Sequence, residues 1–397
     1  MLTSIAAEKN INNTITKAMT LLLAIAGGIS VANIYYNQPL LSEIAKTFHT
    51  TSSSAGLVAT FTQLGYALGI FMFATLGDIK EKKKLILTLT GLVTVSLLGV
   101  ATAQNLLWMN LASFAVGLTS VVPQIISPLA AQLASPKERG KVVGTVVSGL
   151  LIGILLSRTV SGFVGQVAGW RAMFVVAAIL MFILGIIMYY KLPVTKSNTI
   201  DNFTYKELLK SVLTMPRKYP SLMLISISGA LLFCAFSGFW TTMIFLLGNP
   251  PFSMQSDQAG LFGLLGVAGA LGANIIGRLS ETKIVKFIGV TCIGITLISY
   301  LIFGLFSMNI LGMVIGVILL SLGVQGAQVF YQIKLFSLSD DERSRINTVF
   351  VVSNFIGAAA GSTLSAMAWN YYGWNGVCIL GITAVLIALW INSRLKS

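Results

Sequence analysis

Ten long stretches of this chain contain no Asp, Glu, Lys or Arg, a pattern typical of a protein that lies in lipid. The uncharged stretches are 18–42, 50–77, 85–136, 142–157, 159–170, 172–190, 219–256, 258–277, 287–333 and 346–393. About 20 apolar residues cross the hydrocarbon core as a helix. Three stretches have room for two helices and carry a polar break, at Gln104-Asn105, Ser307–Asn309 and Asn370–Asn375. The two segments beside Arg158 join into one helix, so the sequence predicts an all-α membrane protein with twelve transmembrane helices.

The distribution of basic residues predicts the orientation of these helices. Only 10% of the residues are charged, against about 25% in soluble proteins, yet the net charge is +14. With the N-terminus inside, 23 of the 26 basic residues fall in cytoplasmic segments. This asymmetry predicts a multi-pass protein of the inner cell membrane with both termini in the cytoplasm. A nucleic-acid-binding protein would need a basic soluble domain, so no nucleic-acid partner is expected.

The two halves of the chain resemble each other at a constant offset of 204 residues. The matching pairs are Glu138-Arg139 with Glu342-Arg343, Gly153 with Gly357, and Gly169-Trp170 with Gly373-Trp374. Duplication of a six-helix unit predicts two pseudo-symmetric halves, residues 1–190 and 219–397, joined by a cytoplasmic linker at 191–218. Two such halves enclose a central cavity near the bilayer midplane, and a monomer is enough to form that pathway.

The loop after the second predicted helix carries an acidic residue beside a basic cluster. Asp78 is followed by Lys80 and by Lys82, Lys83 and Lys84. Charge-assisted contacts from such residues to neighbouring helices can hold one conformation and release it in another. The alternative is an ordinary lysine-rich loop on the inner side, and the position of Asp78 at the helix end favours the conformational role. Gly277–Glu281 looks like a degenerate copy in the second half.

The fifth predicted helix has small residues at a regular spacing. Gly144, Gly153 and Gly162 recur every nine residues, with Ser157 between the last two. Gly357 and Gly361 occupy the matching part of the eleventh helix. Small residues let helices approach closely in lipid. We therefore expect the fifth and eleventh helices to line the interface between the halves, although Gly and Ser are also common in any membrane helix.

Arg158 is the one charged residue inside a predicted span. It lies about 25 Å along the fifth helix from Lys141 at 1.5 Å per residue, which places it in the outer half of the bilayer. A charge in the membrane is costly and marks a functional site by default, while snorkelling to the outer surface is the competing interpretation. The spans hold no carboxylate. Glu43 and Asp257, at the outer ends of the first and eighth helices, are therefore the candidates for proton coupling, acting on the interactions of Arg158.

Polar and aromatic residues in the spans are candidates for the lining of the substrate pathway. Beside Arg158 they are Asn33, Tyr36, Asn37, Gln38, Gln63, Gln124, Trp240, Gln325, Gln328 and Asn354. Amides in lipid must be paired or face water. Tyr35 suits an anchor at the membrane interface. Amides with aromatic rings suit a polar, partly aromatic solute such as a nucleoside, sugar or drug, and a lone Arg suits an anionic group as well.

Several of these motifs resemble those of the major facilitator superfamily. Gly77-Asp78 with its lysines resembles the signature between helices 2 and 3, with Ala74 where the signature has its Gly. The Gly144–Gly162 pattern resembles the antiporter motif of helix 5, with Arg158 in place of its proline. With Asn33–Leu41 and Gly169–Arg171, the whole chain looks like the arabinose, purine-ribonucleoside and drug efflux branch. The resemblance implies the major facilitator fold and proton-coupled efflux.

The sequence thus predicts a secondary active transporter that moves a small organic solute by alternating access, with protons as the coupled ion and membrane lipid around it. Uptake or uncoupled facilitation by the same fold is the alternative. A membrane-integral enzyme would need a catalytic constellation, and the chain has one His and no nucleotide-binding loop. A non-transporting receptor would carry a further cytoplasmic domain. No cofactor and no metal site are expected.

Overall fold

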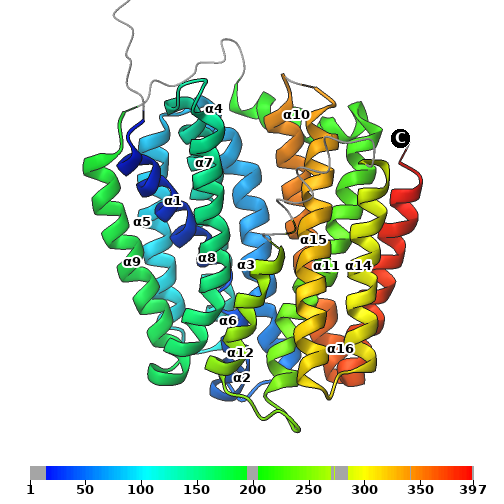
Figure 1. Ribbon diagram of the computed structural model, residues 1–397. Coiled ribbons are helices and arrows are strands. Elements are labelled where there is room, and N and C mark those ends of the chain that lie inside the picture. The colour runs from blue at the N-terminus through cyan, green and yellow to red at the C-terminus, as the bar shows by residue number, and fades with distance from the viewer. Residues whose placement is uncertain (1–14, 195–203, 270–271, 273–284, 340, 396–397) are drawn as a thin grey trace, which may run out of the picture.

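The computed structural model describes residues 15–194, 204–269, 272, 285–339 and 341–395, which form helices and their connections (Figure 1). The helices of the first half are α1 (Lys17–Ala32), η1 (Gln38–Leu40), α2 (Leu41–Thr47), α3 (Ser52–Gly69), η2 (Ile70–Ala74), α4 (Thr75–Ile79), α5 (Lys82–Ala101), α6 (Leu106–Thr119), α7 (Val122–Leu133), α8 (Arg139–Ala168) and α9 (Trp170–Lys191). The linker forms α10 (Tyr205–Lys218). The second half contains α11 (Pro220–Leu247), α12 (Ser256–Leu261), η3 (Phe262–Gly266), α14 (Val285–Leu305), α15 (Ile310–Phe336) and α16 (Arg343–Ser393).

These helices account for twelve spans. Within the described residues, nine helices are long and apolar enough to cross a membrane. One of them, α16, is two spans joined at a kink at Gly373. The first span is α1 followed by η1 and α2 after a turn, and the eighth begins with α12 and η3. The prediction of an all-α membrane protein with twelve helices in two six-helix halves is therefore confirmed.

The repeat seen in the sequence reappears in the backbone. Gly169, between α8 and α9, has a φ of 81°, and Gly373, at the matching position, has a φ of 59°. Only glycine adopts these combinations with extended ψ without strain. Each is followed by a tryptophan whose indole N–H is bonded, Trp170 to the Thr47 hydroxyl at 3.0 Å and Trp374 to the Phe303 carbonyl at 2.9 Å. The same sequence pair thus closes the equivalent turn in both halves.

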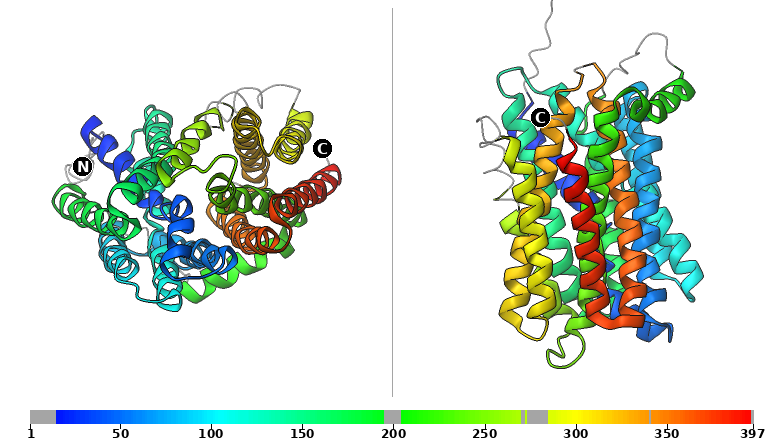
Figure 2. Two further views of the ribbon diagram at one scale, coloured as in Figure 1. Left: turned by 90° about the horizontal axis from the view of Figure 1, so that it is seen from below. Right: turned by 90° about the vertical axis from the view of Figure 1, so that its right-hand side faces the viewer.

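The outward surface of the bundle is apolar. On α9, Ile179, Phe182, Ile183 and Ile186 are all exposed and share one helix face by their spacing. A contiguous apolar surface of this kind is unfavourable in water and suits contact with lipid acyl chains. The two halves lie side by side when the bundle is seen along its axis (Figure 2).

The linker helix α10 lies at the same end of the bundle as the start of α1 and the end of α16 (Figure 1). It begins with a capping box, in which the Thr204 hydroxyl accepts from the Glu207 amide and the Glu207 carboxylate accepts from the Thr204 amide. Those hydrogen bonds lower the pKa of Glu207. Leu208, Val212 and Met215 form the buried face of this helix. Most of the exposed residues are polar, with Leu213 as an exposed apolar side chain.

The linker helix contacts both halves. The Tyr205 hydroxyl donates to the Met72 carbonyl of the first half at 3.0 Å. At the other end of α10, Lys218 lies 2.8 Å from the carboxylate of Glu342, just before α16 of the second half. Hydrogen bonds from Lys218 and from Tyr219 hold the pKa of Glu342 below its usual value. The linker is thus attached to the helix bundle at both ends.

Candidate functional site

The first span is interrupted where the candidate site begins. The backbone leaves the helix at residues 33–37 and resumes with η1, whose second residue, Pro39, has no amide hydrogen to donate. Irregular backbone at membrane depth is tolerated where protein or a water-filled cavity surrounds it. Asn33, Asn37 and Gln38 are all buried there, and the Asn37 amide donates to the Thr62 hydroxyl at 2.9 Å. The break therefore turns backbone and amide groups toward the interface between the halves.

Arg158 lies at this break and is 3% exposed. Its Nε donates to Oε1 of Gln38 at 2.7 Å, and Nη1 lies 3.5 Å from the Ile154 carbonyl. The guanidinium carbon is 4.1 Å from the ring centroid of Trp240 and 4.8 Å from that of Tyr35. Arg158 is therefore buried and does not snorkel. Tyr35, which the sequence analysis interpreted as an interfacial anchor, instead stacks on Arg158 because the helix break turns it inward.

This cation joins the two halves. Arg158 is on α8 of the first half, whereas Trp240 is on α11 of the second. Cation–π pairs that are shielded from water contribute about 2 kcal/mol or more. At the next residue of α8, the Thr159 hydroxyl donates to the Gly260 carbonyl of the second half at 3.0 Å. The predicted pathway residues Arg158, Gln38 and Trp240 thus come together in one cluster.

A second cluster of hydrogen bonds joins α3 to the second half. The Gln63 amide donates to the Ser237 hydroxyl at 2.6 Å and accepts from the Ser362 hydroxyl at 3.0 Å. Ser362 also lies 2.9 Å from Ser237 and 2.8 Å from Thr241, oxygen to oxygen. All four side chains are buried. Gln63 was predicted from the sequence, but its three hydroxyl partners were not.

The remaining predicted pathway residues lie elsewhere in the interior. The Asn354 amide donates to Gln328 at 2.9 Å inside the second half, and Gln124 lies 3.4 Å from the Tyr66 hydroxyl. Gln325 is half-buried and packs beside the Gly269 backbone. The Tyr36 carbonyl accepts a hydrogen bond from the Ser161 hydroxyl, which links the turn after α1 to α8. The predicted lining therefore splits into several separate clusters.

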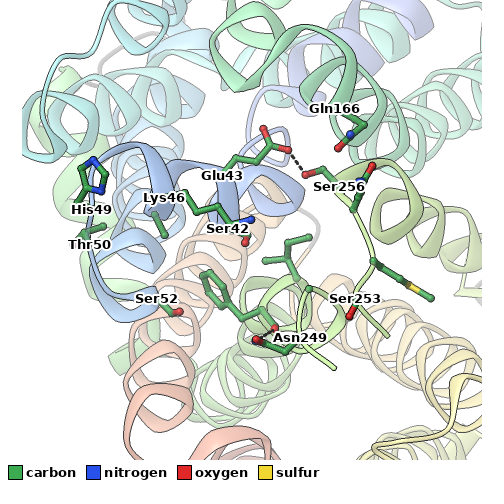
Figure 3. Close-up of a pocket in the computed structure, with 16 residues that line it drawn as sticks. Ser42, Glu43, Lys46, His49, Thr50, Ser52, Gln166, Asn249, Ser253 and Ser256 are labelled. Atoms are coloured by element: carbon green, nitrogen blue, oxygen red, sulfur yellow. Dashed lines mark hydrogen bonds between the residues drawn. The ribbon is translucent and has the colours of Figure 1, made fainter. Parts of the chain in front are cut away.

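The two candidate coupling carboxylates lie at the outer end of the cluster. Glu43 accepts a hydrogen bond from the Ser256 hydroxyl of the second half (Figure 3). Asp257, the next residue, has a buried Oδ1 without a hydrogen-bond partner. Glu43 lines a polar cavity of about 800 Å³, as does Ser256, the residue before Asp257. The residues that line this cavity are Ser42, Glu43, Ala45, Lys46, His49, Thr50, Ser52, Gln166, Ile244, Phe245, Gly248, Asn249, Ser253, Met254, Gln255 and Ser256.

The small residues of α8 make three different kinds of contact. A Cβ at Gly162 would lie 2.2 Å from the Ser256 carbonyl oxygen of the second half, so this glycine does line the interface between the halves. A Cβ at Gly153 would lie 2.2 Å from the Gly28 carbonyl oxygen of α1, inside the first half. Gly144 has nothing within 4 Å of its Cβ position. Ser157 is buried and donates to its own helix, to the Ile154 carbonyl at 2.7 Å.

Gly357 and Gly361 repeat the contact of Gly153. Their Cβ positions lie 2.1 Å from the Ala230 carbonyl oxygen and 2.0 Å from that of Cys234, both on α11 of the same half. The prediction that the fifth and eleventh helices line the interface between the halves fits the contact of Gly162 on α8 with Ser256 and the hydrogen bond from Ser362 on α16 to Gln63. Gly153, Gly357 and Gly361, however, pack inside one half, and Gly144 has no close neighbour. Close approach of helices in lipid also serves the packing within a half, and the sequence spacing does not distinguish the two uses.

The lysine-rich loop after α4 makes contacts to neighbouring helices of the first half. The Lys82 ammonium donates to Gln132 of α7 at 2.5 Å, and the Lys83 ammonium lies 5.8 Å from the ring centroid of Tyr189 on α9. Asp78 is the fourth residue of α4, and its side chain lies outside the described part of the chain, as does the similar Gly277–Glu281 segment. In the part that is described, no three His, Cys, Asp or Glu side chains gather as a metal site.

Comparison with known proteins identifies the family. The model of the Major Facilitator Superfamily matches residues 23–339. An uncharacterized transporter, YgaY of Escherichia coli O157:H7, is 42% identical over 96% of both chains. A probable transporter of Streptomyces coelicolor is 30% identical over 92% of this chain and 86% of its own length. A probable sugar efflux transporter of Helicobacter acinonychis is 26% identical over 89% of both.

Solved structures share the fold. A bacterial homolog of the human lysosomal transporter Spinster, in an inward-facing and occupied conformation, has a TM-score of 0.76 at 13% identity and covers 96% of this chain and 97% of its own. A mutant of the nucleoside transporter NupG has a TM-score of 0.76 at 15% identity, over 95% and 100% of the two chains. The protein is therefore a transporter rather than an enzyme, and the chain belongs to the major facilitator superfamily.

Proposed function

We propose that the protein exports a small organic solute across the inner membrane by alternating access, coupled to the entry of protons. The observation that carries this proposal is the polar contact between the halves. Arg158 with Trp240, and Gln63 with Ser237 and Ser362, are interactions that rotation of one half against the other would break. Buried polar contacts between two otherwise apolar bodies favour a switch between states over a static role.

We infer that the outer side is closed in this conformation. Gly162 on α8 packs against Ser256 of α12, and Gly56 on α3 packs against Ala366 of α16. Both contacts join the halves near the outer ends of the helices. We infer that a solute bound among the clusters of this state exchanges with the predicted cytoplasmic side. Both termini are cytoplasmic in this proposal, and one chain forms the whole pathway.

Glu43 is the residue at which we expect protons to act. Its carboxylate accepts from Ser256 across the outer interface, so protonation would change a contact between the halves. A relative from Helicobacter acinonychis is named a probable sugar efflux transporter, which supports export as the direction of transport. Uptake or uncoupled facilitation by the same fold is the competing function, and the direction of coupled flux separates them.

Everted membrane vesicles test the proposal. Respiration acidifies their lumen, so a proton-coupled exporter accumulates its solute inside, and an uncoupler abolishes the accumulation. A panel of radiolabelled sugars, nucleosides, amino acids and cationic dyes is compared between the parent, Glu43→Gln and Glu138→Gln. Glu138 is a carboxylate at the opposite end of α8, bonded to the Ser135 hydroxyl at 3.4 Å, and serves as the matched control.

We expect Glu43→Gln to lose the dependence on the pH gradient and Glu138→Gln to keep it. Accumulation that needs no gradient in the parent would contradict proton coupling. Accumulation only in right-side-out vesicles would favour uptake.

A further inference from the structure

We propose that Arg158 binds an anionic group, a carboxylate or a phosphate, on the transported solute. This inference rests on the proposed transport function and adds the chemical class of the substrate. It starts from the hydrogen-bonding capacity of one side chain. The guanidinium group has five N–H donors in a fixed plane and no acceptor. Carboxylate and phosphate oxygens match that planar arrangement better than any other biological group.

The donors of Arg158 are incompletely used. Nε is bonded to Gln38 at 2.7 Å and Nη1 has one long contact at 3.5 Å, but Nη2 is buried and has no hydrogen-bond partner. Within the described part of the chain, the ion pairs are formed by Glu342 with Lys218 and with Arg345. Arg158 thus carries its charge in the membrane interior with an unused donor and, among the described residues, no carboxylate partner.

A second unused donor lies at the same place. The indole nitrogen of Trp240 is buried without a hydrogen-bond partner, and its ring lies against the guanidinium group. Trp240 and Arg158 line one small cavity with Gln38, Pro39, Met243, Ile244 and Ala259. Tryptophan is also a donor only. Two donor-only side chains, one of them charged, therefore border a space that lacks an acceptor of matching charge.

The other half of the protein shows that the fold does not need a cation here. At the repeat offset of 204 residues, Ser362 corresponds to Arg158. Ser362 is fully buried, and its hydroxyl is within hydrogen-bonding distance of Ser237, Thr241 and Gln63. A neutral and satisfied group thus fills the equivalent place. A purely structural role leaves the unsatisfied charge of Arg158 unexplained, whereas an anionic ligand explains it.

The cavity beside Arg158 is too small for an anionic group until the halves move apart. Its volume is about 10 Å³, which is space for a single water-sized group. Because Arg158 and Trp240 belong to different halves, movement of the halves widens this space. The solute's anionic group then enters between the two side chains, where it accepts from the guanidinium group and from the Trp240 indole N–H, while the rest of the solute lies in the central pathway. Binding of the anion and separation of the ring would occur together.

Ligand binding by the purified full-length protein in lipid nanodiscs tests the inference. The probes are matched pairs at equal ionic strength: acetate with acetamide, gluconate with glucose, and a nucleoside monophosphate with its nucleoside. Dissociation constants come from isothermal titration, and thermal unfolding with and without each probe gives a second readout. The carboxylate and phosphate pairs distinguish the two kinds of anion.

The variants are Arg158→Gln, Arg158→Lys and Trp240→Phe. Arg171→Gln is the matched control, because Arg171 also stacks on aromatic rings, with its guanidinium carbon 4.2 Å from the Trp170 centroid and 5.9 Å from that of Phe48. Arg171 is exposed, however, and contacts only the first half. Trp240→Phe retains the charge and an aromatic ring but removes the indole donor, so it tests the site even if Arg158→Gln does not fold.

We expect at least one anionic probe to bind the parent more tightly than its neutral partner. Arg158→Gln should weaken that binding by about 10- to 100-fold, the usual effect of losing a hydrogen bond to a charged group. Trp240→Phe should weaken it by a few fold, and Arg171→Gln should leave it unchanged. The inference is wrong if no anion binds better than its neutral partner, or if Arg171→Gln weakens binding as much as Arg158→Gln. Transport of a neutral solute by Arg158→Gln vesicles would overturn the anion site while leaving the transport function in place.

Discussion

Gly162 offers the sharpest test of the conformational interpretation. An alanine Cβ at this position would lie 2.2 Å from the Ser256 carbonyl oxygen, well inside the closest normal contact of about 3 Å. Since Gly162 and Ser256 belong to different halves, the clash exists only when the outer side is closed. Overpacking of this kind costs about 1–3 kcal/mol. The equilibrium between outer-closed and outer-open states should therefore shift toward the open state by about 5- to 150-fold.

The assay is labelling of a buried cysteine from outside. Met243→Cys places a thiol at a residue that is 4% exposed and lines the cavity beside Arg158. The native cysteines, all buried, are first replaced. A membrane-impermeant maleimide added to intact cells then reports opening of the outer side. We expect the Gly162→Ala variant to be labelled faster than the outer-closed parent, at a rate closer to that of a fully open protein.

Two other glycines of the same helix serve as controls. Gly144→Ala should leave labelling unchanged, because nothing lies within 4 Å of the new methyl group. Gly153→Ala clashes with Gly28 inside the first half, so it should lower thermal stability without opening the outer side. Unchanged labelling in Gly162→Ala, or an equal rise in Gly144→Ala, would refute the reasoning.

Three further predictions follow from single contacts. Gln63→Leu removes two hydrogen bonds between the halves, each worth about 0.5–1.5 kcal/mol, and should also raise outer labelling at Met243→Cys, whereas Gln124→Leu should not. Glu342→Gln should increase hydrogen exchange in α10 at pH 7, because it removes the carboxylate that binds Lys218. Since the pKa of Glu342 is lowered from 4.5, the parent should keep this attachment above pH 4.5 and lose it only as the pH falls through the lowered pKa. A parent that loses the attachment between pH 7 and 5 would contradict the assignment. Gly373→Ala and Gly169→Ala meet no neighbouring atom, so each should lower stability by the strain of positive φ alone, about 1–3 kcal/mol, in thermal unfolding; equal stability would show that the turns relax.

The scaffold was predictable because lipid imposes simple rules on the sequence. Runs without charge must be helices that satisfy their own backbone, and polar breaks within them must be turns. The kink at Gly373 lies in the polar break predicted at Asn370–Asn375, and Gly169 matches it by the repeat. Arg158 was also identifiable, because a charge in an apolar helix has few uses.

The partners within the site were not predictable by the same rules. Trp240 reaches Arg158 from the other half, and no periodicity within α8 or α11 encodes that meeting. Serine and threonine in membrane helices usually bond to their own backbone, as Thr242 does to the Gly238 carbonyl at 2.8 Å. Ser237, one residue before Gly238, instead bonds to Gln63 across the interface. The sequence does not separate these two behaviours, because only the packing of the halves decides between them.

The two halves share their scaffold but not their chemistry, and this difference bears on how the protein works. Gly153 of α8 packs closely against the backbone of α1, and Gly357 of α16 packs in the same way against α11, so the internal packing of each half is preserved through the repeat. Five residues after these glycines, one half has Arg158 and the other has Ser362. Packing within each half keeps the moving bodies rigid, which constrains both copies equally. Recognition of a solute requires only one charged group in the shared pathway, so the polar positions at the interface are free to diverge, and the half that carries the unsatisfied charge is the one where a ligand's anionic group would bind.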